Sequence, residues 1–152
     1  MEHYASDAHA QNGFVNSLTE VVVGSNAQVQ HYRINLEQED LLHVGGVHVN
    51  LQRDARFHGF TLAQGSRLKR IDYQVNMLGE GAHLDLNGIY LPRNRQVIDY
   101  HTNVEHCVPH CTSHTRCFAA SLVMLPRRSL TVGFISTRRP RKHWPSSATR
   151  TC

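Results

Sequence analysis

The sequence predicts an all-β fold, a flattened β-solenoid of two facing sheets. A short phrase recurs three times, with alanines 28 and 27 residues apart: Asn26-Ala27-Gln28-Val29, Asp54-Ala55-Arg56-Phe57 and Gly81-Ala82-His83-Leu84. Each copy follows a short apolar run and opens a stretch of alternating polarity, so the repeating unit is strand, corner, strand. A coil that returns every 27 or 28 residues is typical of a solenoid, in which neighbouring coils bury each other's inward side chains.

The alternation is clearest in residues 82–87, where Ala82, Leu84 and Leu86 fall on one face and polar side chains on the other. This predicts one dry and one wet face for each strand. The alanines are expected to stack in one column, at a corner where a larger side chain would crowd the next coil.

A second corner is expected halfway between the alanine corners, so that each coil has two long sides. We place it at Val44-Gly45-Gly46 and at Gln64-Gly65-Ser66. Positive φ angles are expected at corner residues that tolerate them. These residues are Gly24, Gly65 and Gly79, together with Asn26 and Asp54.

Charge divides the chain into two unlike parts. All twelve acidic residues lie between Glu2 and Glu105, against eight Lys and Arg up to Cys111, which gives that part a net charge of −4 with histidine neutral. The other eight Lys and Arg lie in the last 41 residues, which contain no carboxylate side chain. The overall net charge of +4 is therefore an average over two unlike segments, and it does not indicate that the chain as a whole binds nucleic acid.

From Thr112 onwards the repeat is lost, and Pro126-Arg127-Arg128 and residues 137–142 are strongly basic. We therefore divide the chain into a core, residues 1–113, and an irregular basic tail, residues 114–152. The tail is either a disordered basic arm or the product of a shifted reading frame. No signal peptide and no stretch of 18 apolar residues is present, so we expect a soluble, cytoplasmic protein whose four cysteines are thiols.

A metal site is one interpretation of the segment from His106 to Cys117. It contains six donors within twelve residues: His106, Cys107, His110, Cys111, His114 and Cys117. On an extended strand Cys107 and Cys111 would stand about 13 Å apart, too far for two ligands of one zinc ion, and only a sharp turn at Pro109 would bring them together. The other interpretation is a corner with partly buried thiols, and the sequence leaves open whether Cys107, Cys111, His106 and His110 bind metal.

Two other polar groups are candidates for contacts rather than for catalysis. His43 and His48 flank Gly45-Gly46 and could meet across that corner. Asp99 and His101 share a strand face and could hydrogen-bond to each other. The chain has no nucleophile elbow, phosphate-binding loop or zincin motif, so no catalytic, cofactor-binding or metal-binding residue is assigned and no enzyme activity is expected.

Several segments resemble the SufB/SufD family of iron–sulfur cluster assembly proteins, and SufD most. They cover residues 2–113 almost without a gap. They are Glu2-His3-Tyr4, residues 19–27, His31-Tyr32-Arg33, residues 84–91 and, above all, Asp99-Tyr100-His101-Thr102-Asn103-Val104-Glu105-His106 and Pro109-His110-Cys111-Thr112-Ser113.

This resemblance implies a right-handed parallel β-helix that acts as a non-catalytic scaffold. In the full-length family member the partners are SufB-like and SufC-like subunits, and the assembled complex handles the iron–sulfur cluster. No bound cofactor is assigned to this chain, and neither a membrane nor nucleic acid is an expected partner.

The departures from the family concern both ends. Family members have further residues before the point that matches Met1, and further coils and a helical segment after Ser113, so we expect an internal fragment whose reading frame is lost near Ser113. Alone, it is expected to self-associate through solenoid edges and to bind neither SufC nor SufB in the family's manner. The alternative function is a metal-binding or nucleic-acid-binding module that uses the Cys/His cluster and the basic tail.

Overall fold

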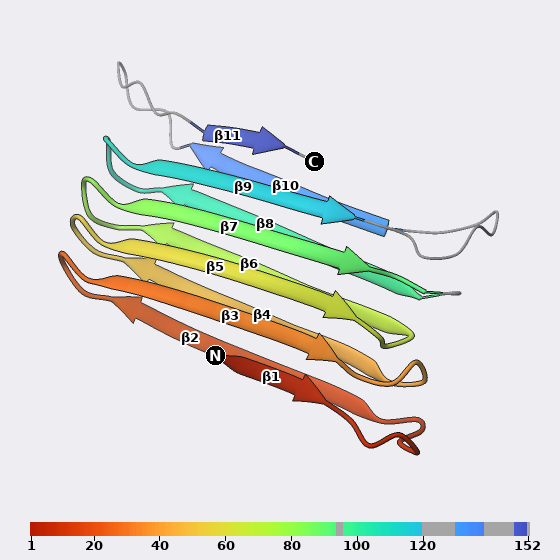
Figure 1. Ribbon diagram of the computed structural model, residues 1–152. Helices are drawn as coiled ribbons and strands as arrows, with labels where there is room; N and C mark the ends of the chain where they lie inside the picture. Colours follow the sequence, from red (N-terminus) through yellow and green to blue (C-terminus); the bar gives the residue numbers. More distant parts are fainter. Residues whose placement is uncertain (94–95, 120–129, 139–147, 152) are drawn as a thin grey trace.

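The computed structural model describes residues 1–93, 96–119, 130–138 and 148–151, with the side chains of residues 1–93 and 96–118. These residues form strands, and from β1 to β9 the described connections are short turns (Figure 1). The strands are β1 (Glu2–Ala5), β2 (Phe14–Val23), β3 (Gln28–Leu36), β4 (Leu42–Leu51), β5 (Arg56–Gln64), β6 (Leu68–Met77), β7 (His83–Leu91), β8 (Val97–His106), β9 (Thr112–Ala119), β10 (Leu130–Arg138) and β11 (Ala148–Thr151).

The strands alternate between two sheets. The odd-numbered strands form one sheet in the order β1-β3-β5-β7-β9-β11, and the even-numbered strands form the other in the order β10-β8-β6-β4-β2. Every pairing is parallel. The chain therefore winds as a flattened coil with the two sheets facing each other (Figure 1), which confirms the predicted solenoid.

The predicted repeat is also the repeat of the coil. Gln28, Arg56, His83 and Thr112 are successive register partners, so the coil returns after 28, 27 and 29 residues. The residue after each alanine donates its N–H to the carbonyl oxygen of the alanine one coil earlier, at 2.9 Å for both Arg56 and His83. This confirms the expected column of Ala27, Ala55 and Ala82, and Cys111 continues it.

The corner before this column uses the left-handed backbone region in each of the four coils for which the structure describes it. The residues are Asn26 (φ 59°), Asp54 (φ 56°), Gly81 (φ 74°) and His110 (φ 59°). The expectation was correct for Asn26 and Asp54, but wrong for Gly24 and Gly79, which do not adopt positive φ. Gly79 serves close approach instead, because an added Cβ would lie 2.0 Å from the backbone nitrogen of Arg53.

The second corner was predicted correctly in one coil and wrongly in another. Gly65 has a φ of 78° and follows β5, as expected. Gly45 and Gly46 lie inside β4, and the turn consists of residues 37–41. The glycine pair indicated a turn, but Gly45 lies against the preceding coil, where an added Cβ would be 2.7 Å from the carbonyl oxygen of Ser17.

Inward side chains build a continuous core between the sheets. One column of this core is Val21, Val49, Val75 and Val104, which are successive register partners. The predicted alternation in residues 82–87 is confirmed, since residues 82, 84 and 86 are buried and their neighbours are partly or fully exposed. Burial of apolar surface in such columns is the main force that holds stacked coils together.

Beyond residue 113 the described backbone continues both sheets. β9 pairs with β7, and β10 and β11 pair with β8 and β9. Residues 120–129, 139–147 and 152 lie outside the described residues. The division into a core and a basic tail, and the shift of reading frame, therefore stay predictions.

Candidate functional site: a buried ionic cluster inside the coil

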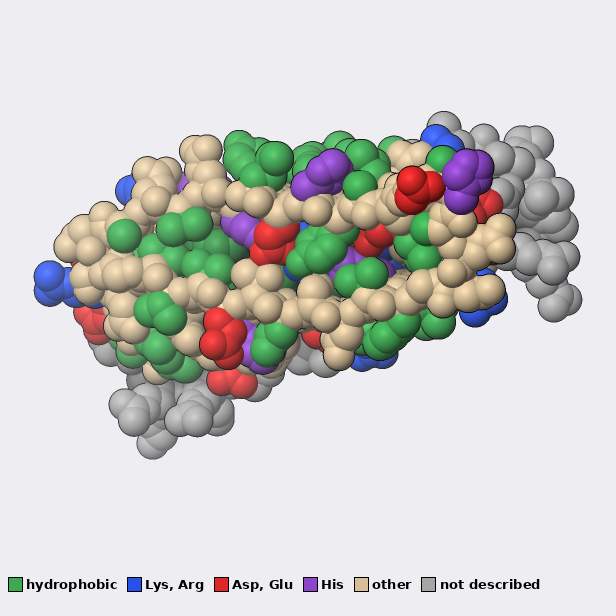
Figure 2. Space-filling model, turned by 90° about the horizontal axis from the view of Figure 1, so that it is seen from below, with side chains coloured by type: hydrophobic (Ala, Val, Ile, Leu, Met, Phe, Trp, Pro, Cys, Tyr) green, Lys and Arg blue, Asp and Glu red, His purple; other side chains and the backbone are tan. Residues whose placement is uncertain are grey.

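The interior is not apolar throughout. Near the end formed by β1 and β2, charged side chains replace the core hydrophobics, and Figure 2 shows acidic and histidine side chains in the middle of this end of the coil. We call this group the ionic cluster. Its members are Glu2, Arg33, Glu37, His43 and Lys69. The side chains of Arg33, His43 and Lys69 have no solvent exposure.

Glu37 binds two partners through separate oxygens. Lys69 donates from Nζ to Oε2 at 2.6 Å, and His43 Nδ1 hydrogen-bonds to Oε1. Burial by itself would raise the pKa of the Glu37 carboxyl, but the hydrogen bond from His43 and the charge of Lys69 outweigh it, so the pKa is lowered. Burial lowers the pKa of Lys69, and Glu37 opposes that shift. Because Glu37 is an acid held below its usual range, we assign an ionised pair at neutral pH.

The contacts of His43 determine which of its nitrogens carries the proton. Arg33 Nη2 lies 3.2 Å from His43 Nε2. A guanidinium only donates hydrogen bonds, so Nε2 is the acceptor and Nδ1–H donates to Glu37. His43 is therefore a neutral link between the two ends of the cluster.

Arg33 and Glu2 form the other end. Arg33 Nη1 donates to Glu2 Oε2 at 2.8 Å, and its guanidinium lies 4.5 Å from the centre of the Tyr4 ring. Thr19 and His31 also bind Glu2, at 2.7 and 3.1 Å. Burial raises the pKa of the Glu2 carboxyl, but the Thr19 hydroxyl and the Arg33 charge outweigh it and the pKa is lowered. Two carboxylates thus balance two cations across the cluster.

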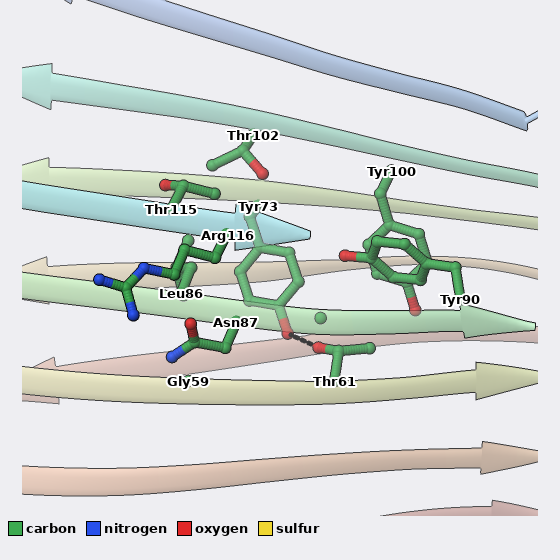
Figure 3. A pocket seen from close by; sticks show the side chains of 11 residues that line it. Gly59, Thr61, Tyr73, Leu86, Asn87, Tyr90, Tyr100, Thr102, Thr115 and Arg116 are labelled. Carbon is green, nitrogen blue, oxygen red and sulfur yellow. Dashed lines mark hydrogen bonds between the residues drawn. The ribbon is translucent and has the colours of Figure 1, made fainter. Parts of the chain in front are cut away.

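A tyrosine group lies deeper in the coil and lines a small pocket (Figure 3). Tyr73 and Thr61 share a hydrogen bond of 2.9 Å, and the rings of Tyr90 and Tyr100 lie 4.6 Å apart. Burial raises the pKa of both Tyr73 and Tyr100. The pocket has room for about one water molecule, and the raised pKa values keep the Tyr73 and Tyr100 phenols protonated at neutral pH.

The family model "SUF system FeS cluster assembly, SufBD core domain" matches residues 1–121. The chain belongs to the SufBD family. The match passes Ser113, where the family resemblance in the sequence ended, and covers β1 to β9.

Two curated SufBD relatives are similar to this chain. An iron–sulfur cluster assembly SufBD family protein of Synechocystis is 26% identical over 97 residues, which are 64% of this chain and 21% of the relative. One of Mycobacterium leprae is 25% identical over 114 residues, 75% of this chain and 28% of the relative. The chain thus spans roughly a quarter of these SufBD proteins. No solved structure matches it significantly.

The sequence-predicted Cys/His segment is a corner in this SufBD coil. Residues 107–111 form the turn between β8 and β9, with Cys111 buried and Cys107 exposed. Burial raises the pKa of the Cys111 thiol, which donates to the carbonyl oxygen of Gly79 at 3.4 Å. Among the described residues, no three His, Cys, Asp or Glu side chains are placed to hold a metal ion. The candidate donors of this segment therefore do not form a metal site.

The two contact predictions had different outcomes. Asp99 and His101 do interact, at 3.0 Å, and Arg70 adds a second contact to Asp99 at 3.4 Å. The expectation for His43 and His48 was wrong, because both lie in β4 and alternation places His43 inside and His48 outside.

Sequence reasoning missed the ionic cluster. The signal that could have revealed it is the alternation along β3, since residues 31, 33 and 35 share one face of the strand and all three are polar.

In the described residues the structure has no helix that is long and apolar enough to cross a membrane.

Proposed function

We propose that this chain is part of a non-catalytic, SufD-like scaffold subunit for iron–sulfur cluster assembly. The observation that carries the proposal is the family match over residues 1–121, which coincides with the stacked coils from β1 to β9. In this role the iron–sulfur cluster is cargo of the assembled complex, and no cofactor resides in the chain.

The buried chemistry supports a structural role. In the ionic cluster each carboxylate is bound by a cation, and His43 is held between Glu37 and Arg33. A nucleophile needs an adjacent free base and a space for substrate. The tyrosine pocket offers room for about one water molecule. The described interior therefore favours support over catalysis.

We further propose that the partners of the full-length protein are a SufB-like and a SufC-like subunit, and that its compartment is the cytoplasm. The outer faces of the two sheets and the edge strands at the ends of the stack suit a scaffold. An edge strand can bind a neighbouring subunit by main-chain pairing, and a sheet face can bind one through its side chains. The experiment must supply the rest of the protein, since the chain spans 21% and 28% of its relatives.

A chimera tests this function. Residues 1–121 of this chain replace the matched segment of the Mycobacterium leprae relative, and the product is purified with SufB-like and SufC-like subunits. We expect a stable complex that supports cluster assembly, whereas a version with the segment deleted should fail, and the unaltered relative serves as the reference. A folded chimera that captures neither subunit and assembles no cluster would overturn the proposal.

A further inference from the structure

The outer face of the odd-numbered sheet carries a row of apolar side chains, which we call the odd-face band. It crosses β3, β5, β7 and β9, and its members are successive register partners: Ile34, Leu62, Ile89 and Phe118. Beside it, the rings of Tyr32 and Phe60 lie 6.3 Å apart. Tyr32 is 45% and Phe118 68% exposed. Contiguous apolar surface on an outer face is typical of an interaction site.

The outer face of the even-numbered sheet carries a second apolar row, the even-face band. It crosses β2, β4, β6 and β8, and its members are again register partners: Phe14, Leu42, Leu68 and Val97. Odd-numbered strands end at the second corner and even-numbered strands begin there. Both bands therefore lie toward the second corner, on opposite sides of the coil, and Figure 2 shows hydrophobic side chains on both long sides.

The two outer faces differ in charge. Among the described side chains, the even-numbered face has four carboxylates and one guanidinium, a net charge of −3 with histidine neutral: Glu20, Asp72, Asp99, Glu105 and Arg70. The odd-numbered face has Arg56, Arg116 and Asp85, a net charge of +1. Asp85 is also bound by two imidazoles, since its Oδ2 lies 3.1 Å from His58 Nδ1 and 2.9 Å from His83 Nε2. The faces are thus complementary in charge.

A second copy of the chain fits these faces. If it is displaced perpendicular to the sheets, the odd-numbered face of one copy lies on the even-numbered face of the next. The two bands then meet, because both lie toward the second corner, and the acidic face opposes the basic one. Facing sheets pack about 10 Å apart, as they do across a core. Contact between two faces of the same kind would instead bring like charges together.

The area of a face is sufficient for such a contact. The strands β3, β5 and β7 have nine residues each. Strands of this length are about 30 Å long, and four of them are about 19 Å wide, so the contact would cover about 570 Å² on each partner. The total of about 1,100 Å² just exceeds the roughly 1,000 Å² that a specific interface needs. This favours a weak, reversible association.

We propose that copies of this chain associate face to face, with the odd-face band of one copy on the even-face band of the next. The contact is heterologous, because each copy uses two different surfaces, so it continues from copy to copy instead of closing at a dimer. It differs from pairing through the edge strands, and it goes beyond the scaffold proposal without resting on it.

The test is sedimentation velocity of the reduced 152-residue chain from low to high micromolar concentration, where the average mass should rise beyond that of a dimer. Leu62→Glu places a carboxylate in the odd-face band, opposite the acidic face. Leu68→Lys places an ammonium group in the even-face band, opposite the basic face. Each variant alone should associate at least about tenfold more weakly, because an apolar contact is lost and like charges meet.

Mixing the two variants distinguishes a lost contact from lost folding. The Leu62→Glu variant keeps its even-numbered face and the Leu68→Lys variant its odd-numbered face, so the mixture should form a 1:1 pair that does not grow. If either variant melts early, Tyr32→Glu or Phe14→Lys at a more exposed position of the same face replaces it.

A matched pair of variants controls for net charge. Arg56→Glu, on the odd-numbered face, should weaken the association. Arg53→Glu makes the same change of charge in a turn, at a side chain that is 70% exposed, and should associate as the original chain does. The proposal is overturned if the original chain stays monomeric at high micromolar concentration, if either band variant alone associates like the original, or if the mixture of two folded variants stays monomeric.

Discussion

Lys69 and Glu37 form an ion pair of 2.6 Å inside the coil, with side-chain exposures of 0% and 2%. The residues are 32 positions apart in the sequence. Each charge depends on the other, because removing one partner of a buried pair leaves the second without solvent or counter-ion.

The first prediction therefore concerns Lys69→Met. It should lower the free energy of unfolding by about 3–5 kcal/mol, since Glu37 would remain buried with only His43 as donor. Urea denaturation measures the loss. The matched control is Arg70→Met in the same strand, whose side chain is 46% exposed, and its cost should stay within about 1 kcal/mol. Equal costs for the two variants would contradict the buried pair.

The second prediction is a dependence of stability on pH. The folded-state pKa of Glu37 and of Glu2 lies below the ordinary value of 4.5. A lowered acid pKa contributes stability that is fully present above the unfolded-state value and is lost as pH falls through the folded-state value. Urea midpoints should thus fall as the pH is taken from neutral to below 4.5.

Glu37→Gln is the variant that tests the source of this loss. It should be less stable than the original chain at neutral pH, and the difference should shrink in acid, where the original Glu37 is protonated as well. A difference that stays constant across the pH range would assign the acid loss to other carboxyls.

The third prediction concerns the alanine column. Ala55→Leu should destabilise the coil by about 1–3 kcal/mol, because Ala55 has 0% exposure and the added atoms would overpack the corner. Ala27→Leu is the control, since Ala27 occupies the same corner position but is exposed. Thermal unfolding of the two variants should separate them, and similar melting temperatures would contradict the packing described for this column.

The fourth prediction concerns the second corner. Gly65→Ala should lower the free energy of unfolding by about 1–3 kcal/mol or more. Gly65 has a φ of 78°, and an added Cβ would lie 1.6 Å from the carbonyl oxygen of Glu37. Gly24→Ala should be nearly neutral, since nothing lies within 4 Å of the position of its Cβ. Urea midpoints of both variants provide the comparison, and a tolerated alanine at position 65 would refute this corner.

The sequence predicted the solenoid because its signals are local and repeated. The alanine steps and the alternation in residues 82–87 determine period and parity without knowledge of any distant contact. The prediction of a corner at Gly45-Gly46 was wrong for a physical reason. Glycine is used both in turns and where two backbones approach closely, and only the position of Ser17 in the neighbouring coil shows which use applies.

Neither charged group could be predicted in the same way. Parity places Arg33 inside, but its partner Glu2 is 31 residues away and joins it only through the register of β1 and β3. Likewise, alternation places His83 and Asp85 outside, whereas the contact with His58 depends on the pairing of β5 with β7.

The most direct test of the stacked coil is a methyl NMR measurement on valine-labelled protein. The inward column Val21, Val49, Val75 and Val104 joins four successive strands of one sheet. We predict methyl contacts between each successive pair and none between Val49 and Val104, which are two coils apart. Missing contacts within these successive pairs, or a contact between Val49 and Val104, would contradict the solenoid and, with it, the arrangement of the buried charges.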